Sequence, residues 1–103
     1  MFLLIVNYIA PIEEVERLMP DHFAYLADHF ADGTFLVSGR QKPRTGGFIV
    51  AAGDDRAAVE RLIATDPFVT GGVATYTVLE IEPTRAAPAW RPVLRAAGVE
   101  LPG

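Results

Sequence analysis

The stretch FLLIVNYI, residues 2–9, decides the fold that this sequence predicts. Successive side chains of a strand point to opposite faces, and both alternating sets of positions are apolar until Asn7. A strand that is apolar on both faces lies in the middle of a sheet and is covered on both sides. We therefore expect residues 2–9 to form a central strand, and the rest of the chain to supply what covers it.

Two short helices are expected after this strand, because Pro20 interrupts a helical pattern. Pro11 suits the first turn of a helix, and several glutamates follow it, at the end where the helix dipole favours negative charge. A proline inside a continuous helix costs about 3 kcal/mol. The sequence therefore predicts one helix that ends near Met19 and a second that runs from Pro20 to about Ala31 and stops before Gly33.

The remaining pattern predicts three more strands and one more helix. The strands are expected at residues 34–39, 48–52 and 73–81. The loop of residues 40–47 joins the first two as a hairpin, Asp54 or Asp55 caps the next helix, and Asp66, the residue before a proline, ends it. The resulting order βαββαβ is that of the α+β ferredoxin-like sandwich, with a four-stranded antiparallel sheet and its helices on one face.

The second face of such a sheet would be left apolar, because the helices cover only the first. Two such sheets packed face to face bury both apolar faces, so we expect a homodimer. Residues 1–85 form the predicted domain, and residues 86–103 form a C-terminal tail rich in proline and alanine. Trp90 and Leu94 are candidate anchors in this tail, which either packs on the partner subunit or is loosely held.

The composition excludes several classes of function. The chain has 103 residues and a net charge of −4, and its basic residues form no cluster, which disfavours a nucleic-acid partner. The absence of cysteine excludes disulfides and thiolate metal sites, and it fits a cytoplasmic location. No stretch approaches the roughly 18 apolar residues of a membrane span, so no membrane partner is expected. No dinucleotide-binding or P-loop glycine pattern occurs, so no cofactor is expected.

The residues that suggest chemistry are His22 and Asp66. His22 falls on a stripe with Leu26 that should face the sheet, so its ring is not simply solvated. It is either a neutral core histidine with one hydrogen bond or a group that transfers protons. Asp66 is either an ordinary turn residue before Pro67 or a carboxylate that accepts from one imidazole nitrogen. In the second case it fixes the tautomer and leaves the other nitrogen ready to take or give a proton.

Further candidates lie on the hairpin and on the first helical segment. Arg40 and Arg44 either hold an anionic group or belong to an ordinary exposed hairpin. Ser38 has no base beside it in the sequence, so a nucleophilic role is unsupported. His29, two turns after His22, is a weak metal signal, and we expect no metal site. The aromatic residues that either line a cleft or belong to the core or an interface are Tyr8 and Tyr76.

Four motifs carry a resemblance: His22 followed by FAYL, then GTFLVSG at 33–39, PRTGG at 43–47 and TDPFV at 65–69. Together they resemble the YciI-like (YCII-related) domain family over residues 1 to about 85. The histidine and the Asp-Pro-Phe element match in order and separation. The resemblance implies a ferredoxin-like fold of the dimeric α+β barrel group and a cleft centred on the histidine and aspartate. Arg40 stands where the family often has proline, which places a cation either at the cleft mouth or merely on the surface.

Some relatives in that family are dehydrochlorinases that act on chlorinated aromatic ring compounds. The resemblance therefore implies a small dimeric enzyme in which His22 is the general base or acid and Asp66 orients it. It would move a proton on a small cyclic or aromatic molecule, with isomerisation or elimination as the outcome. The alternatives are a non-catalytic ligand-binding or accessory module and a structural dimer without a site. The residues expected to bind the substrate are Ser38, Arg40, Arg44 and Phe68.

Overall fold

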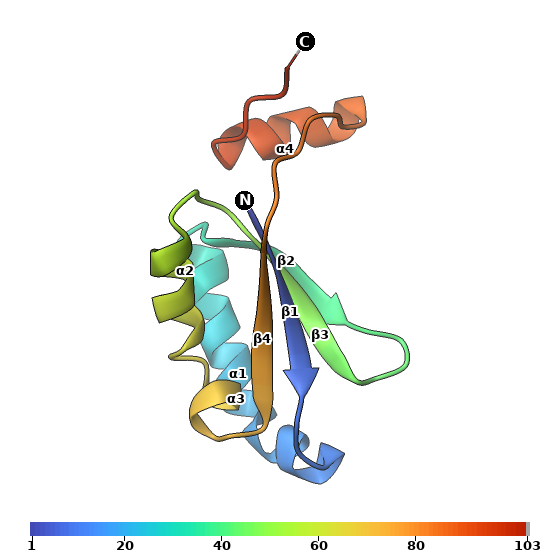
Figure 1. Ribbon diagram of the computed structural model, residues 1–103, viewed down its shortest axis with the longest axis vertical. Helices are drawn as coiled ribbons and strands as arrows, with labels where there is room; N and C mark the ends of the chain where they lie inside the picture. The colour runs from blue at the N-terminus through green and yellow to red at the C-terminus, as the bar shows by residue number, and fades with distance from the viewer. Residues whose placement is uncertain (103) are drawn as a thin grey trace.

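A computed structural model describes residues 1–102 and confirms the predicted α+β order (Figure 1). The elements of the βαββαβ unit are β1 (Phe2–Tyr8), α1 (Ile12–Ala31), β2 (Phe35–Arg40), β3 (Gly46–Ala51), α2 (Arg56–Ile63), α3 (Pro67–Thr70) and β4 (Ala74–Glu80). The strands form one antiparallel sheet in the order β2-β3-β1-β4. Within residues 1–102, every helix is too short or too polar to span a lipid bilayer.

The first strand lies in the middle of the sheet, between β3 and β4, as its apolar sequence predicts. Phe2, Leu4 and Val6 are buried under α1, α2 and α3, which lie on one side of the sheet (Figure 1). Leu3 and Ile5 point to the opposite face and are only half-buried. The core therefore fills the space between the sheet and α1, and α1, α2 and α3 leave the second face of the sheet uncovered.

The predicted break at Pro20 is wrong, because α1 is a single helix from Ile12 to Ala31 with this proline inside it. Figure 1 shows that the first turns of α1, in blue, run in a different direction from the rest, and proline is a common cause of such kinks. Val15 before the proline and Leu26 after it are both buried. Burying an aliphatic side chain stabilises by about 1.5–3 kcal/mol, so the packing of the two halves offsets the local penalty of about 3 kcal/mol.

The hairpin loop is shorter than predicted, because β2 extends to Arg40 and β3 begins at Gly46. Arg40 pairs with Gly47, and Ser38 pairs with Ile49. Gly46 allows this extension, since a Cβ atom there would lie 1.8 Å from the carbonyl oxygen of Val6. The strands therefore continue into the stretch that the sequence marks as a loop, because glycine lets their backbones approach closely.

The tail contains a short helical segment beyond one end of the sheet (Figure 1). It consists of the 3₁₀ turn η1 (Pro88–Trp90) and α4 (Arg91–Ala96). Of the two predicted anchors, Leu94 is buried and Trp90 is 58% exposed. Leu94 therefore fixes the tail, and Trp90 presents its ring to the surroundings.

We expect Gly46→Ala to destabilise the fold, because the added methyl group must displace the backbone of β1. Overpacking of this kind costs about 1–3 kcal/mol. Denaturant unfolding followed by circular dichroism measures the change. Thr75→Ala, at an exposed residue of β4, is the control and should change the free energy of unfolding by less than about 0.5 kcal/mol. Equal stability of the Gly46→Ala variant and the parent would contradict the close approach.

Candidate functional site

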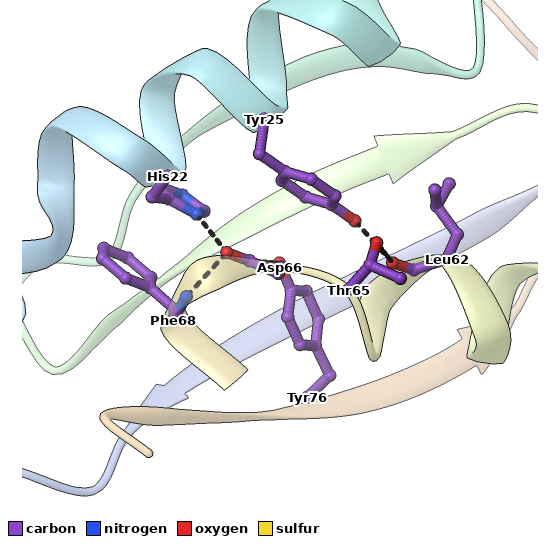
Figure 2. Close-up of polar contacts among 7 residues, drawn as sticks. All are labelled: His22, Tyr25, Leu62, Thr65, Asp66, Phe68 and Tyr76. Atoms are coloured by element: carbon purple, nitrogen blue, oxygen red, sulfur yellow. Dashed lines mark hydrogen bonds and ion pairs between the residues drawn. The ribbon is translucent and has the colours of Figure 1, made fainter. Parts of the chain in front are cut away.

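His22 and Asp66 meet inside the fold, although 44 positions separate them in the sequence. The distance between Nδ1 of His22 and Oδ1 of Asp66 is 2.8 Å. The Asp66 side chain is completely buried, and the His22 residue is 7% exposed. Figure 2 shows the two side chains pointing toward each other, from α1 and from the start of α3. The pair is therefore a buried contact between a ring nitrogen and a carboxylate.

Local structure explains why Asp66 can reach this place. The proline that follows it favours an extended backbone, and Asp66 has φ −61° and ψ 129°. It is the N-cap of α3, and its Oδ1 accepts a hydrogen bond of 2.9 Å from the backbone N–H of Phe68. The same oxygen of Asp66 thus caps the turn and contacts the histidine.

A third donor to Asp66 comes from β4, and the sequence analysis did not identify it. The hydroxyl of Tyr76 donates to Oδ2 at 2.5 Å, in the range of hydrogen bonds to an ionised acceptor. Tyr76 pairs with Val6, so it points to the face of the sheet that the helices cover. The alternation of residues 73–81 could have revealed this direction, but nothing in the sequence indicates its partner. The carboxylate therefore has a donor on each oxygen and is fully satisfied.

Two tyrosines, the buried Tyr25 and the half-buried Tyr76, lie beside the carboxylate (Figure 2). Burial raises the pKa of Tyr76 above its ordinary value, and the negative charge of Asp66 raises it further. Burial and then the charge of Asp66 also raise the pKa of Tyr25, whose hydroxyl donates to the carbonyl oxygen of Leu62 at 3.0 Å. Both phenols therefore stay protonated at neutral pH and act as hydrogen-bond donors.

The contact with Asp66 determines which nitrogen of His22 is available. An ionised carboxylate only accepts hydrogen bonds, so Nδ1 of His22 carries the proton. Nε2 has no hydrogen-bond partner among residues 1–102, and it is not among the buried polar atoms left without one. The ring stacks on Phe68 with a centroid distance of 3.8 Å and an angle of 6° between the planes. The stacking and the hydrogen bond hold the ring in place while Nε2 keeps a free lone pair.

A hollow of about 240 Å³ lies between α1 and the sheet, beside His22. It is lined by Val6, Tyr8, Met19, His22, Phe23, Leu26, Ser38, Gly39, Arg40, Gly47, Phe48, Ile49 and Phe68. Three of the four residues expected to bind the substrate, namely Ser38, Arg40 and Phe68, are in this set. Arg44 is not, because its guanidinium donates to Glu16 at 3.1 Å. Ser38, Arg40 and Phe68 thus line the same hollow as His22, and Arg44 does not.

The size and walls of the hollow suit one small ring. A cavity of about 150 Å³ lined by apolar side chains accommodates benzene, so 240 Å³ leaves room for a ring with substituents. Most of the lining side chains are aliphatic or aromatic, and polar groups come from only a few of them. This combination of apolar walls and a few polar groups is typical of small-molecule sites.

No metal centre accompanies the pair in the part of the chain that the structure describes. Among residues 1–102, no three histidine, cysteine, aspartate or glutamate side chains gather closely enough to hold a metal ion. Nδ1 of His29 instead lies 3.1 Å from Oδ2 of Asp32 at the C-terminal end of α1. That contact and the bond from Thr34 lower the pKa of the exposed Asp32 carboxyl group, with Thr34 as the main cause.

The chain is similar to known proteins in sequence and in fold. The sequence model of the YCII-related domain family matches residues 1–82. No curated protein sequence matches the chain. One similar solved structure is 5-chloro-2-hydroxyhydroquinone dehydrochlorinase from Burkholderia phenoliruptrix AC1100, in complex with 2,5-dihydroxybenzoquinone. The TM-score is 0.63 and the sequence identity 24%, with 79% of this chain and 93% of that chain covered. At this identity the likeness supports the fold.

We expect Tyr76→Phe to destabilise the protein more than Tyr25→Phe. The first change leaves one oxygen of the buried Asp66 carboxylate without its donor, and hydrogen bonds to charged groups contribute about 1.5–3 kcal/mol. The second removes a bond to a neutral carbonyl that Thr65 also contacts, with an effect of about 1 kcal/mol. Denaturant unfolding of both variants measures the difference. Equal losses would show that Tyr76 contributes only packing.

Proposed function

The chain belongs to the YCII-related domain family, and we propose that it is a small-molecule enzyme in which His22 transfers a proton and Asp66 orients it. The observation that carries this proposal is the arrangement around the imidazole. Nδ1 is held by a buried, fully bonded carboxylate, Nε2 has no hydrogen-bond partner within residues 1–102, and the residue lines a mostly apolar hollow of about 240 Å³. A merely structural histidine has no need of a hollow next to its second nitrogen.

The proposed step is the removal of a proton from the substrate by Nε2 of His22. The electron pair of the broken C–H or O–H bond forms a new C=C or C=O double bond, and the imidazole becomes an imidazolium ion. Asp66 stabilises that positive charge from the other side of the ring, as the buried carboxylate of a catalytic triad does. In an elimination a leaving group such as chloride departs with its bonding pair from a saturated carbon, which a chlorinated hydroquinone gains in its keto tautomer; the proton then comes from a remaining ring hydroxyl. In an isomerisation the imidazolium returns the proton to another atom of the same molecule.

The similar solved structure supports elimination as the first reaction to test. That protein is named a dehydrochlorinase, and its complex holds 2,5-dihydroxybenzoquinone. A compound of this class, one ring with oxygen substituents, is compatible with the size of the hollow in this chain. Phe68 and Ser38 line the hollow. In this proposal Phe68 contacts the ring of the substrate, and Ser38 forms a hydrogen bond with the substrate.

The second candidate function is a ligand-binding or accessory module without turnover. It is favoured by the small number of proton-transferring groups at the hollow, where the lining set offers the imidazole of His22 and the phenol of Tyr8. Such a module would hold a polar ligand at His22 and return it unchanged. Product formation over time separates the two candidates, because only the enzyme accumulates product while both bind the ligand.

We also propose that two copies pack through the uncovered faces of their sheets. Leu79 is 45% exposed and Val37 is 40% exposed on strands whose outer face carries the half-buried Leu3 and Ile5. Apolar surface of this kind on a sheet needs a covering layer. A homodimer supplies the layer from the chain itself.

Light scattering after size-exclusion chromatography tests the dimer. The parent chain should have twice the mass of one chain, and Leu79→Lys should reduce it toward a single chain, because a charge on this face opposes its burial. Ile9→Lys makes the same kind of change at a residue that is 58% exposed beyond the end of β1, and it should leave the mass unchanged. A parent chain that is monomeric at high protein concentration would exclude this arrangement.

The enzyme proposal is tested with 5-chloro-2-hydroxyhydroquinone and related chlorinated phenols and hydroquinones as candidate substrates. We expect release of chloride by the parent chain and a loss of at least about 100-fold in His22→Gln, the usual contribution of a general base. His29→Gln, the same change at a histidine outside the hollow, should retain activity. Full activity of His22→Gln would exclude the proposed base. Saturable binding without any product would favour the module.

A further inference from the structure

We infer that the hollow takes a single-ring ligand that carries a carboxylate group, and that Arg40 is the residue that selects this group. The inference deepens the proposed function. It rests on that function in one respect, namely that Nε2 of His22 is the atom that removes a proton from the ligand. The recognition of the anion itself is a matter of binding and is independent of turnover. It is carried by the direction, the lack of partners and the surroundings of the Arg40 side chain.

The register of the sheet directs Arg40 toward the hollow. Residues paired across two antiparallel strands point to the same face, and Arg40 pairs with Gly47 while Ser38 pairs with Ile49. Ile49 belongs to the core beneath the helices. Arg40 and Ser38 therefore project toward α1 and both line the hollow. His22 faces them from α1, so the ligand lies between a helix wall that carries the base and a sheet wall that carries the cation.

The guanidinium of Arg40 has no partner within residues 1–102. Each ion pair of an arginine in this part of the chain involves another residue: Arg17 with Glu14, Arg44 with Glu16, and Arg56 with Glu60. No hydrogen bond of the Arg40 side chain to residues 1–102 is present either, although the neighbouring Gln41 uses its amide to bind two carbonyl oxygens. All five N–H donors of Arg40 are thus available to a ligand.

No carboxylate lines the hollow to compete for this cation. Asp66 lies behind the ring of His22, is completely buried and already accepts from three donors. Among the residues that line the hollow, Arg40 carries the one permanent charge, and this positive charge attracts an anion. A planar carboxylate fits a guanidinium through two parallel hydrogen bonds, which makes it the anionic group that this residue recognises best.

The apolar walls limit what can accompany the carboxylate. Val6, Leu26 and Phe68 leave little polar surface between the sheet wall and the histidine. A hydrophobic ring fills this space, with its carboxylate at Arg40 and its opposite edge toward Nε2 of His22. The chemical class is therefore a ring carboxylate, aromatic or partly saturated, in which the reacting C–H bond lies on the edge away from the acid group.

Benzoate and its neutral isostere benzamide are the probes that test this inference. They differ in the charge of one group and are similar in size to the ring that the hollow accommodates. Each is titrated into the full chain labelled with ¹⁵N in its histidines, and binding is followed by the ring signals of His22. We expect benzoate to shift these signals and to bind at least about tenfold more tightly than benzamide, as hydrogen bonds between charged groups imply.

Arg40→Gln should abolish the preference for benzoate, because it removes the cation and leaves the apolar walls unchanged. Arg61→Gln is the matched control, since Arg61 is exposed on α2 and does not line the hollow. It should preserve the preference. Equal binding of benzoate and benzamide by the parent chain would overturn the inference, and so would a preference that survives Arg40→Gln.

The outcomes of this experiment and of the turnover assay are separable. A preference for benzoate that depends on Arg40 supports the inference even if His22→Gln retains full activity in the turnover assay. Chloride release from an uncharged phenol, combined with equal binding of the two probes, would leave His22 as the base and overturn the assignment of Arg40.

Discussion

A buried carboxylate has to be satisfied where it lies, and the arrangement around Asp66 follows from this constraint. Its donors come from three different elements: the ring of His22 on α1, the backbone N–H of Phe68 in α3 and the hydroxyl of Tyr76 on β4. Tyr76 is the one donor to Oδ2, so its loss leaves that oxygen unpaired in the core, whereas Oδ1 accepts from both His22 and Phe68. The contact therefore couples the position of the long helix to the sheet and to the turn after α2.

The same constraint makes His22 chemically distinctive. Because Nδ1 is used as a donor toward Asp66, the lone pair of Nε2 is the group that remains. Phe68 stacks on the ring, and the hollow opens beside it. The Nδ1 edge of the His22 ring thus stabilises the fold, and the Nε2 edge is free to contact a ligand. The position of Nε2 is fixed because the ring is part of the core.

Much of this could be predicted from the sequence, because its signals are local. The apolar alternation of residues 2–9 predicted the central strand. The residue before Pro67 marked a helix boundary, but α2 already ends at Ile63 and Asp66 instead begins the short helix α3. The prediction failed at Pro20, where the local penalty is outweighed by burial on both sides of the kink. It also ended the hairpin strands too early, because the close approach of Gly46 to β1 depends on a strand far away in the sequence.

The sequence by itself determined the order of the elements, the apolar character of both sheet faces, and the His22 and Asp66 motifs. Only the tertiary structure decided which partners these residues have. It brought Tyr76 to the carboxylate, paired Arg44 with Glu16 and left Arg40 at the hollow. The reason is that periodicity and turn chemistry act over a few neighbouring residues. A hydrogen bond or an ion pair between distant positions depends instead on how the helix and the sheet pack together.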